Sequence, residues 1–305
     1  MGKSKHKISN WKQYNQDLVQ RGSMTVWMDE QAIQQWHCQT HHGRRGRGFH
    51  YSDSAIETAL MLKAVFKLPL RALEGFINSL FELMNVPLQS PDYSCISKRA
   101  KTVEIKYRLS SHGPVAHLFI DATGLKVYGE GEWKIRKHGK EKRRVWRKLH
   151  LAVDAATHAI VAAEVSLETV GDNEVLPTLL NPLRRKIEQV SADGAYDTRA
   201  CYALLQKKGI KATIPPRKNA AFWKKGHPRN EAVAALKAGE LEQWKKDSGY
   251  HQRSIAETAM YRFKQLIGPK LSLRSYNAQV GEILAGVKVM NKVIGLGMPI
   301  RQAVN

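Results

Sequence analysis

Apolar residues recur at helical spacing through the first third of the chain. Ser54-x-x-Glu57 has the pattern of a capping box and precedes an apolar run over residues 59–66, which predicts one helix. Leu68-Pro69-Leu70 breaks that run. Apolar side chains at spacings of three and four then predict a second helix over residues 71–84. This part of the chain is therefore predicted to be helical.

A short third helix is predicted after the turn at Asn85-Val86-Pro87. Ser94 is placed to cap it, and it carries the cations Lys98 and Arg99. Three helices that end in a basic one resemble a helix-turn-helix in outline, with the last helix reading DNA. An ordinary helical subdomain with a solvated last helix explains the same pattern. Both interpretations stay open, with Lys98 and Arg99 as candidate DNA contacts.

The pattern changes to that of strands after Gly113-Pro114. Residues 115–120 form a nearly continuous apolar run, as in a strand buried on both faces, and the run ends at Asp121. Alternation over residues 145–153, followed by a turn and a second apolar run, predicts an antiparallel hairpin. A brief strand ending near Ala192 follows, and helices separate the later strands. The prediction is a mixed α/β sheet.

These changes of pattern divide the chain into three segments. We expect residues 1–112 to form a helical, DNA-binding region and residues 113–270 to form the α/β domain. Residues 271–305 carry a final apolar helix, which packs on the core or joins a dimer.

Charge narrows the choice of partner. The 305 residues include 49 lysines and arginines and 27 acidic residues, giving a net charge of +22. Such an excess is unfavourable for a compact monomer unless a polyanion neutralises it, so nucleic acid is the first partner to expect. No apolar run approaches the roughly 20 residues of a membrane span, and no secretory segment follows Met1. Three scattered cysteines fit a reducing compartment. We expect a cytoplasmic protein with no membrane partner.

The densest positive charge lies in residues 134–148. This run holds nine cations, among them Arg143, Arg144 and Lys148, against one acidic residue. It would neutralise several phosphates and make DNA binding depend strongly on salt. Trp146 in the same run is a candidate for stacking on an unpaired or flipped base. Burial in a core is the commoner role of a tryptophan, and it stays open here.

Two aspartates follow predicted strands. Asp121 comes directly after Ile120, and Asp193 follows Ala192, 193 − 121 = 72 positions later. Two such carboxylates close together repel each other, and sharing divalent cations relieves that repulsion. The alternative is that each aspartate only begins a turn, where this residue is common.

A polar stripe follows near the C-terminal end of the α/β segment. Tyr250, Arg253, Glu257 and Lys264 fall within an arc of about 60° if residues 250–264 are helical. One carboxylate among two cations and a phenol suits a metal-bound phosphate, with Glu257 on the ion and the cations on phosphate oxygens. The solvated face of an ordinary amphipathic helix is the alternative.

At this point the residues resemble a known family, the DDE-type transposases of bacterial insertion sequences, and within it the insertion-sequence-five group. The resemblance lies in Asp121-Ala122-Thr123-Gly124-Leu125-Lys126, in Ala192-Asp193-Gly194-Ala195-Tyr196-Asp197 and in the spacing of the polar stripe. It extends over nearly the whole chain. The Tyr-Arg-Glu-Lys spacing is its most specific element, and an isolated Asp-Gly is almost without weight.

The resemblance implies a ribonuclease-H-like catalytic core. In such a core Asp121, Asp193 and Glu257 would hold two Mg²⁺ ions, for which Mn²⁺ would substitute. The implied activity is binding of the terminal inverted repeats, cleavage at the element ends and joining of the 3′-hydroxyl ends to target DNA by two-metal phosphoryl transfer. It also implies a bacterial protein that associates with the nucleoid when bound to double-stranded DNA. Two ends must meet, so a homodimer or larger complex is expected.

Two other functions remain possible from the sequence. A non-catalytic DNA-binding repressor of the element would need the charge and the N-terminal helices, but not three carboxylates. A ribonuclease-H-like nuclease would cut without joining. Strand nicking by wild type and by triad variants distinguishes the first alternative, and a strand-transfer product distinguishes the second.

Overall fold

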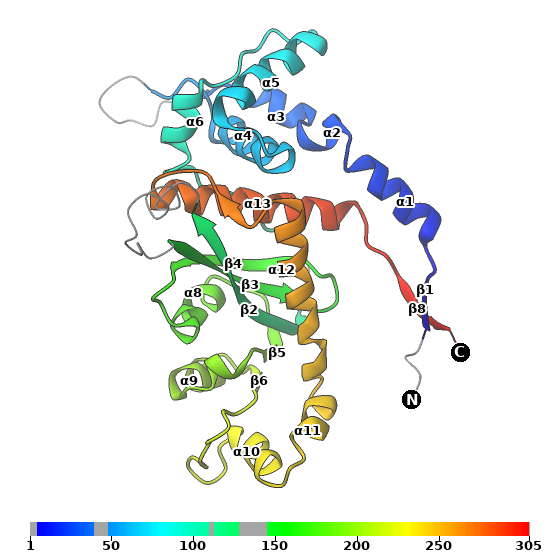
Figure 1. Cartoon of the computed structure of the whole chain (residues 1–305), viewed down its shortest axis with the longest axis vertical. Coiled ribbons are helices and arrows are strands. Elements are labelled where there is room, and N and C mark those ends of the chain that lie inside the picture. The colour runs from blue at the N-terminus through cyan, green and yellow to red at the C-terminus, as the bar shows by residue number, and fades with distance from the viewer. Residues whose placement is uncertain (1–4, 40–47, 110–112, 128–144, 305) are drawn as a thin grey trace, which may run out of the picture. The chain divides into compact units, whose positions relative to one another are not determined.

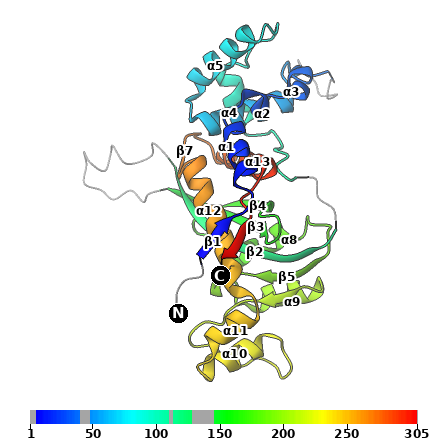
Figure 2. The same ribbon diagram turned by 90° about the vertical axis from the view of Figure 1, so that its right-hand side faces the viewer.

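A computed structural model describes residues 5–39, 48–109, 113–127 and 145–304 (Figures 1 and 2). It divides into two compact units. The first comprises Met1–Tyr107 with Leu273–Asn305, and the second comprises Arg108–Ser272. The final apolar helix, which the sequence boundaries set apart, therefore belongs to the same unit as the N-terminal helices.

The first unit consists of helices and a two-stranded ribbon. Its elements are β1 (Lys5–Ile8), α1 (Trp11–Gln20), α2 (Met24–Trp27), α3 (Glu30–Gln34), α4 (Asp53–Phe66), α5 (Leu70–Leu83), α6 (Tyr93–Arg99), α13 (Tyr276–Leu296) and β8 (Arg301–Val304). Helices α4 and α5 confirm the two predicted from apolar spacing. The ribbon joins β1 antiparallel to β8, so the two ends of the described chain lie together.

Helix α13 packs along α4, and buried ion pairs join the two. Lys63 contacts Glu282 at 2.5 Å, and Lys288 contacts Glu57 at 2.6 Å. The expected capping box is wrong: the hydroxyl of Ser52 accepts from the Ala55 N–H and starts α4 at Asp53. Glu57 has a different role, because its carboxylate is buried against α13 rather than turned back to cap its own helix.

The second unit is built on a mixed sheet. Its elements are β2 (Val115–Val127), β3 (Trp146–Asp154), β4 (Ile160–Leu167), η1 (Asp172–Val175), α8 (Leu176–Leu180), β5 (Ile187–Ser191), η2 (Gly194–Tyr196), α9 (Arg199–Lys207), β6 (Lys211–Thr213), α10 (Arg229–Lys237), α11 (Leu241–Asp247), η3 (Tyr250–Arg253), α12 (Ser254–Leu266) and β7 (Lys270–Leu271).

The strand order is β4-β3-β2-β5-β6, with β7 pairing with β2 off this path. Strands β2, β3 and β4 are antiparallel neighbours, whereas β5 lies parallel to both β2 and β6. A three-stranded antiparallel meander continued by two parallel strands that follow helical connections is the ribonuclease-H-like arrangement. The predicted mixed α/β class and the predicted hairpin are confirmed.

Helices cover both faces of this sheet. On one face, Leu118, Ile120 and Ala152 form a buried core with apolar residues of α8 and α9. Helix α12 contacts β2 and β3, and Figures 1 and 2 show it on the other side of the sheet from α8 and α9. Because side chains alternate along a strand, Asp121 lies on the face opposite to that of Ile120.

Strand β2 is longer than the sequence indicated. It does not end at Asp121 but continues to Val127, and β3 pairs with it as far as Lys126 opposite Trp146. The partner strand supplies the hydrogen bonds that keep residues 122–127 extended, although their own sequence is not an apolar run. Asp121 is therefore a mid-strand residue with a flanking strand to hold it.

No helix in the described ranges is long and apolar enough to cross a bilayer.

Candidate active site

Asp121 lies within β2, and Asp193 lies two residues beyond the end of the neighbouring strand β5, at the equivalent register. The last paired residues of the parallel strands β2 and β5 are Phe119 and Ser191, and each aspartate lies two residues further along. On the same face, His117 Nε2 lies 2.7 Å from Ser191 Oγ. Parallel neighbours lie about 4.8 Å apart, so this register directs both carboxylates to the same side of the sheet.

Each aspartate is also fixed by a local hydrogen bond. Asp121 Oδ1 accepts from the N–H of Ala122 at 2.9 Å, and Asp193 Oδ1 accepts from the N–H of Ala195 at 2.9 Å, which caps η2. In both residues one carboxylate oxygen is engaged with backbone, and the other is available for a ligand from outside the strand.

The polar stripe of the sequence faces these aspartates from η3 and α12. Its first residues, Tyr250 to Arg253, form a 3₁₀ turn rather than the α-helix expected, and α12 begins at Ser254. The helix buries Ala256, Ala259, Met260 and Phe263 against the sheet. Glu257 lies outside this buried face and is exposed.

Arg253 joins the two parts of the site. Its Nη1 lies 3.1 Å from Asp121 Oδ2, and its Nη2 donates to Glu257 Oε1. Tyr250 adds a cation–π contact, with the Arg253 guanidinium carbon 5.9 Å from the centre of its ring. Lys264 lies two turns beyond Glu257 in α12 and makes no ion pair with the three carboxylates in the described structure.

Charge and burial shift the pKa values of these groups in a consistent way. Burial raises the pKa of Asp121, and the neighbouring Asp193 and Glu257 raise it further, whereas Arg253 and the Ala122 N–H oppose the rise. Burial likewise raises the pKa of Tyr250, and all three carboxylates add to that effect. Burial would lower the pKa of Arg253, but Tyr250 and the carboxylates raise it on balance. Asp193 and Glu257 therefore both act electrostatically on Asp121 and on Tyr250.

The carboxylates of Asp121, Asp193 and Glu257 are chemically suited to bind a hard divalent cation. Carboxylates are the ligands that Mg²⁺ and Mn²⁺ prefer, and the mutual repulsion of these three favours a shared positive charge. As the side chains stand, no three His, Cys, Asp or Glu residues in the described ranges are close enough together to hold an ion. The Arg253 guanidinium supplies the positive charge between Asp121 and Glu257 instead.

The other predicted DNA contacts are dispersed. Lys148 Nζ donates to Asp172 Oδ1 and to the carbonyl of Val170, both at 2.9 Å. A Cβ on Gly124 would lie 3.3 Å from the Trp146 ring, so the ring packs closely over this glycine. Arg143 and Arg144 lie outside the described residues.

Lys98 and Arg99 of α6 differ sharply although they are neighbours. Lys98 is exposed. Arg99 is buried, donates to the Tyr51 carbonyl at 2.9 Å and pairs with Asp53. Its guanidinium is thus committed to holding α6 beside the start of α4. The cap of α6 is Asp92 rather than Ser94, because Asp92 accepts from the Ser94 and Cys95 N–H groups.

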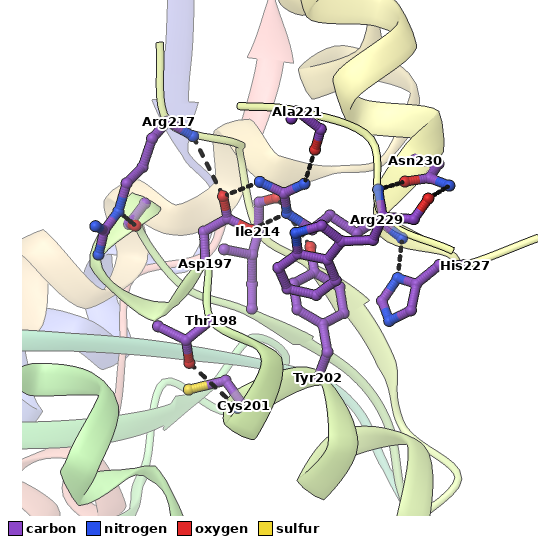
Figure 3. Close-up of polar contacts among 12 residues, drawn as sticks. Asp197, Thr198, Cys201, Tyr202, Ile214, Arg217, Ala221, His227, Arg229 and Asn230 are labelled. Carbon is purple, nitrogen blue, oxygen red and sulfur yellow. Dashed lines mark hydrogen bonds and ion pairs between the residues drawn. The ribbon is translucent and has the colours of Figure 1, made fainter. Parts of the chain in front are cut away.

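A buried ion pair near the site was missed from the sequence. Asp197, which directly precedes the helix-capping residue Thr198, forms a two-pronged contact with Arg229, with 2.7 Å from Nη2 to Oδ2 (Figure 3). Trp223 packs against Tyr202 and over the Arg229 guanidinium. No local pattern marks this pair, because 32 positions separate its members.

Two buried polar atoms near the aspartates are also not indicated by any sequence pattern. The Tyr196 hydroxyl and His150 Nδ1 are both buried and have no hydrogen-bond partner among the described residues. The imidazole of His150 meets Ser166 Oγ through Nε2 at 2.8 Å. Burial, together with Lys148, lowers the pKa of His150 to about 4, although Asp172 opposes the shift.

Comparison with known proteins was made on sequence and on structure. Residues 114–291 match a family model described as "Transposase DDE domain", and residues 19–130 match a second model with the same description. The chain is similar to the piggyBac transposase in a synaptic complex with hairpin DNA, at 12% identity and a TM-score of 0.40, over 95% of this chain and 77% of that one. It is also similar to the pre-cleavage Mos1 transpososome, at 11% identity and a TM-score of 0.20, over 86% and 83% of the two chains.

Proposed function

Because the chain belongs to the family of DDE transposases, we propose that it cuts DNA at the ends of an insertion sequence and joins the freed 3′-hydroxyl ends to target DNA. The single observation that carries this proposal is the equivalent register of Asp121 and Asp193, with Glu257 of α12 acting electrostatically on Asp121. A protein that only bound DNA would have no use for three repelling carboxylates at one place.

Asp121, Asp193 and Glu257 are the residues that would hold divalent cations, Mg²⁺ or Mn²⁺. When bound, these ions supply positive charge and Lewis acidity at the phosphorus that is attacked. The carboxylates supply the oxygen ligands for these ions. Repulsion among the carboxylates is relieved when a cation binds, and this favours binding. The register of β2 and β5 fixes the backbone spacing of the two aspartates before DNA arrives, and side-chain movement would bring the three carboxylates within reach of shared ions.

The remaining side chains of the stripe would bind and orient the DNA strand. Arg253, at the end of η3, carries a planar guanidinium that matches two phosphate oxygens, and Lys264 lies on α12, the helix that follows. Tyr250 holds the guanidinium through its ring. Lys98, Lys148 and Trp146 are proposed as additional DNA contacts, together with Arg143 and Arg144 of the basic run.

Cutting and joining both ends of an element requires two active sites near each other. We therefore propose that at least two copies of the chain assemble on end DNA. Mass measurement of the complex with paired ends tests this, and a single copy that processes both ends would contradict it.

The activity is tested with DNA taken from the flanks of the gene that encodes this chain. Purified protein, Mg²⁺ and a labelled end duplex should give a nick at the element end and then a strand-transfer product. Asp121→Asn, Asp193→Asn and Glu257→Gln should each lower nicking on the order of 100-fold or more while retaining DNA binding. Glu242→Gln is the matched control, since Glu242 is an exposed carboxylate paired with Lys245.

The outcomes separate the alternatives. Nicking without a transfer product would favour a nuclease that only cuts. DNA binding without any nicking by wild type would favour a repressor. Triad variants that nick like wild type would refute the enzyme assignment.

A further inference from the structure

Arg253 is held between two of the three carboxylates by contacts from different parts of the fold. One contact reaches Asp121 on β2, 132 positions earlier in the chain, and the other reaches Glu257 one turn along α12. The Arg253 and Asp121 side chains are only 22% and 17% exposed, whereas Glu257 is 55% exposed. The pair with Asp121 is thus the sheltered one, and it ties α12 to the sheet.

The oxygens that Arg253 engages are those that a cation would need. Asp121 Oδ1 already accepts from the Ala122 N–H, so Oδ2 is the oxygen left for an external ligand, and Arg253 contacts Oδ2. A guanidinium and a divalent ion cannot both occupy the position between this oxygen and Glu257. Arg253 and the ion therefore compete for one place.

Phosphate offers the guanidinium an alternative partner. Arginine donates two parallel hydrogen bonds to phosphate as readily as to carboxylate, and charge-assisted bonds of this kind are among the strongest in proteins. Arg253 stands at the junction between η3 and α12, on the polar side of the stripe. A DNA phosphate at the site would draw the guanidinium off the carboxylates and leave them for the ion.

We propose that Arg253 is an exchangeable counter-ion: without DNA it neutralises Asp121 and Glu257 and weakens divalent-cation binding, and a DNA phosphate releases it. This inference rests on the proposed function, because it concerns the same carboxylates and the same DNA. Its consequence is that DNA and the ion strengthen each other's binding. Linkage requires the effect to be reciprocal, and such couplings are typically about 5- to 150-fold.

The decisive measurement is the affinity of the whole protein for Mn²⁺ in the absence of DNA. The paramagnetic resonance signal of free Mn²⁺ reports how much of the ion is unbound. Arg253→Gln should bind Mn²⁺ about tenfold more tightly than wild type, since the competing cation is gone. Arg253→Lys should fall between the two, because it keeps the charge but cannot hold both carboxylates. Lys264→Gln is the matched control: it removes a cation of α12 that pairs with neither carboxylate, and the Mn²⁺ affinity of this variant should stay within about twofold of wild type.

A second measurement tests the reciprocal effect. Ca²⁺ at constant ionic strength should tighten binding of the labelled end duplex by wild type, read as fluorescence anisotropy. The gain should be smaller in Arg253→Gln, in which no counter-ion is released. Circular dichroism verifies that each variant is folded. If Arg253→Gln is unfolded, Arg253→Lys is compared with wild type in its place.

The failures can be told apart. Equal Mn²⁺ affinity in wild type, Arg253→Gln and Arg253→Lys, lost in Asp121→Asn, would overturn the counter-ion role and leave the metal site standing. An equal Ca²⁺ gain in wild type and Arg253→Gln would also overturn it. Absence of Mn²⁺ binding in every protein, with DNA present as well, would overturn both this inference and the proposed chemistry.

Discussion

Asp121 and Arg253 form an ion pair of 3.1 Å between the central strand of the sheet and the junction that precedes α12. Strand β2 is fixed by neighbours on both sides, so the position of Asp121 does not depend on Arg253. The ion pair instead sets where the guanidinium rests. A strongly positive chain thus directs one of its cations inward, onto the acids of its own candidate active site.

The first prediction concerns how much the charge of Asp121 destabilises the folded protein. Burial, Asp193 and Glu257 raise the pKa of Asp121, so its charged form is disfavoured in the folded state. Asp121→Asn keeps the shape, removes the charge, and should raise the free energy of unfolding by on the order of 1 kcal/mol while abolishing nicking. Urea denaturation at neutral pH measures the change.

Glu257→Gln is the comparison for this prediction. Its carboxylate is 55% exposed, so neutralising it should change the free energy of unfolding by less than about 0.5 kcal/mol. If Asp121→Asn is instead clearly less stable than wild type, the Arg253 pair outweighs the burial cost and the electrostatic description of the site is wrong.

The second prediction concerns the buried pair of Asp197 and Arg229. Both side chains are at most 5% exposed, so removing one partner leaves an uncompensated charge in the interior. Arg229→Leu should lower the free energy of unfolding by about 3–5 kcal/mol, and Asp197→Leu added to it should recover a large part. Lys245→Ala, which breaks the surface pair with Glu242, should cost about 0.5 kcal/mol or less. A double variant no more stable than Arg229→Leu alone would refute this account.

How much of this could be read from the sequence depends on the distance over which each signal acts. The helices α4 and α5 and the hairpin of β3 and β4 follow from local apolar spacing, and all were predicted. The extension of β2 past Asp121 was not, because hydrogen bonds from β3 hold those residues extended. Glu57 was read as a local cap because its partner Lys288 lies in a helix more than two hundred residues away.

The same reasoning applies to the candidate site. The sequence motifs identified Asp121, Asp193 and Glu257 as site residues. The contact of Arg253 with two of them depends on how α12 packs on β2, which the sequence does not show. Asp197 is a similar case: it directly precedes the start of a helix, yet Thr198 caps α9 and Asp197 pairs with the distant Arg229. Local rules assign a residue one nearby partner, and tertiary structure offers it a stronger one.

The third prediction compares two glycines of α13. A Cβ on Gly281 would meet the Ala100 carbonyl oxygen closer than nonbonded atoms can approach, whereas one on Gly295 would meet nothing within 4 Å. Gly281→Ala should therefore lower the free energy of unfolding by about 1–3 kcal/mol, because backbone cannot move aside cheaply. Gly295→Ala should raise it by about 0.5–1 kcal/mol through helix propensity. Equal effects at both positions would show that α13 does not approach Ala100 as described.

The fourth prediction concerns acid sensitivity. His150 is fully buried, and burial and Lys148 lower its pKa to about 4 from the ordinary 6.5. Between these two pH values the unfolded chain binds a proton that the folded chain does not, so the free energy of unfolding falls as the pH is lowered from 6.5 towards 4. Above pH 6.5 this residue causes no loss of stability. The loss attributable to this residue between pH 7 and pH 5 should be about 2 kcal/mol.

The test is the free energy of unfolding of wild type and of His150→Gln at several pH values between 7 and 5. Glutamine keeps a polar group for Ser166 Oγ but does not titrate, so the variant should lose about 2 kcal/mol less than wild type over this range. His117, whose pKa burial and Lys211 also lower to about 4, contributes to the wild-type slope and stays present in the variant. The difference between the two proteins therefore isolates His150. Parallel curves for wild type and His150→Gln would mean that His150 is not held neutral in the folded state.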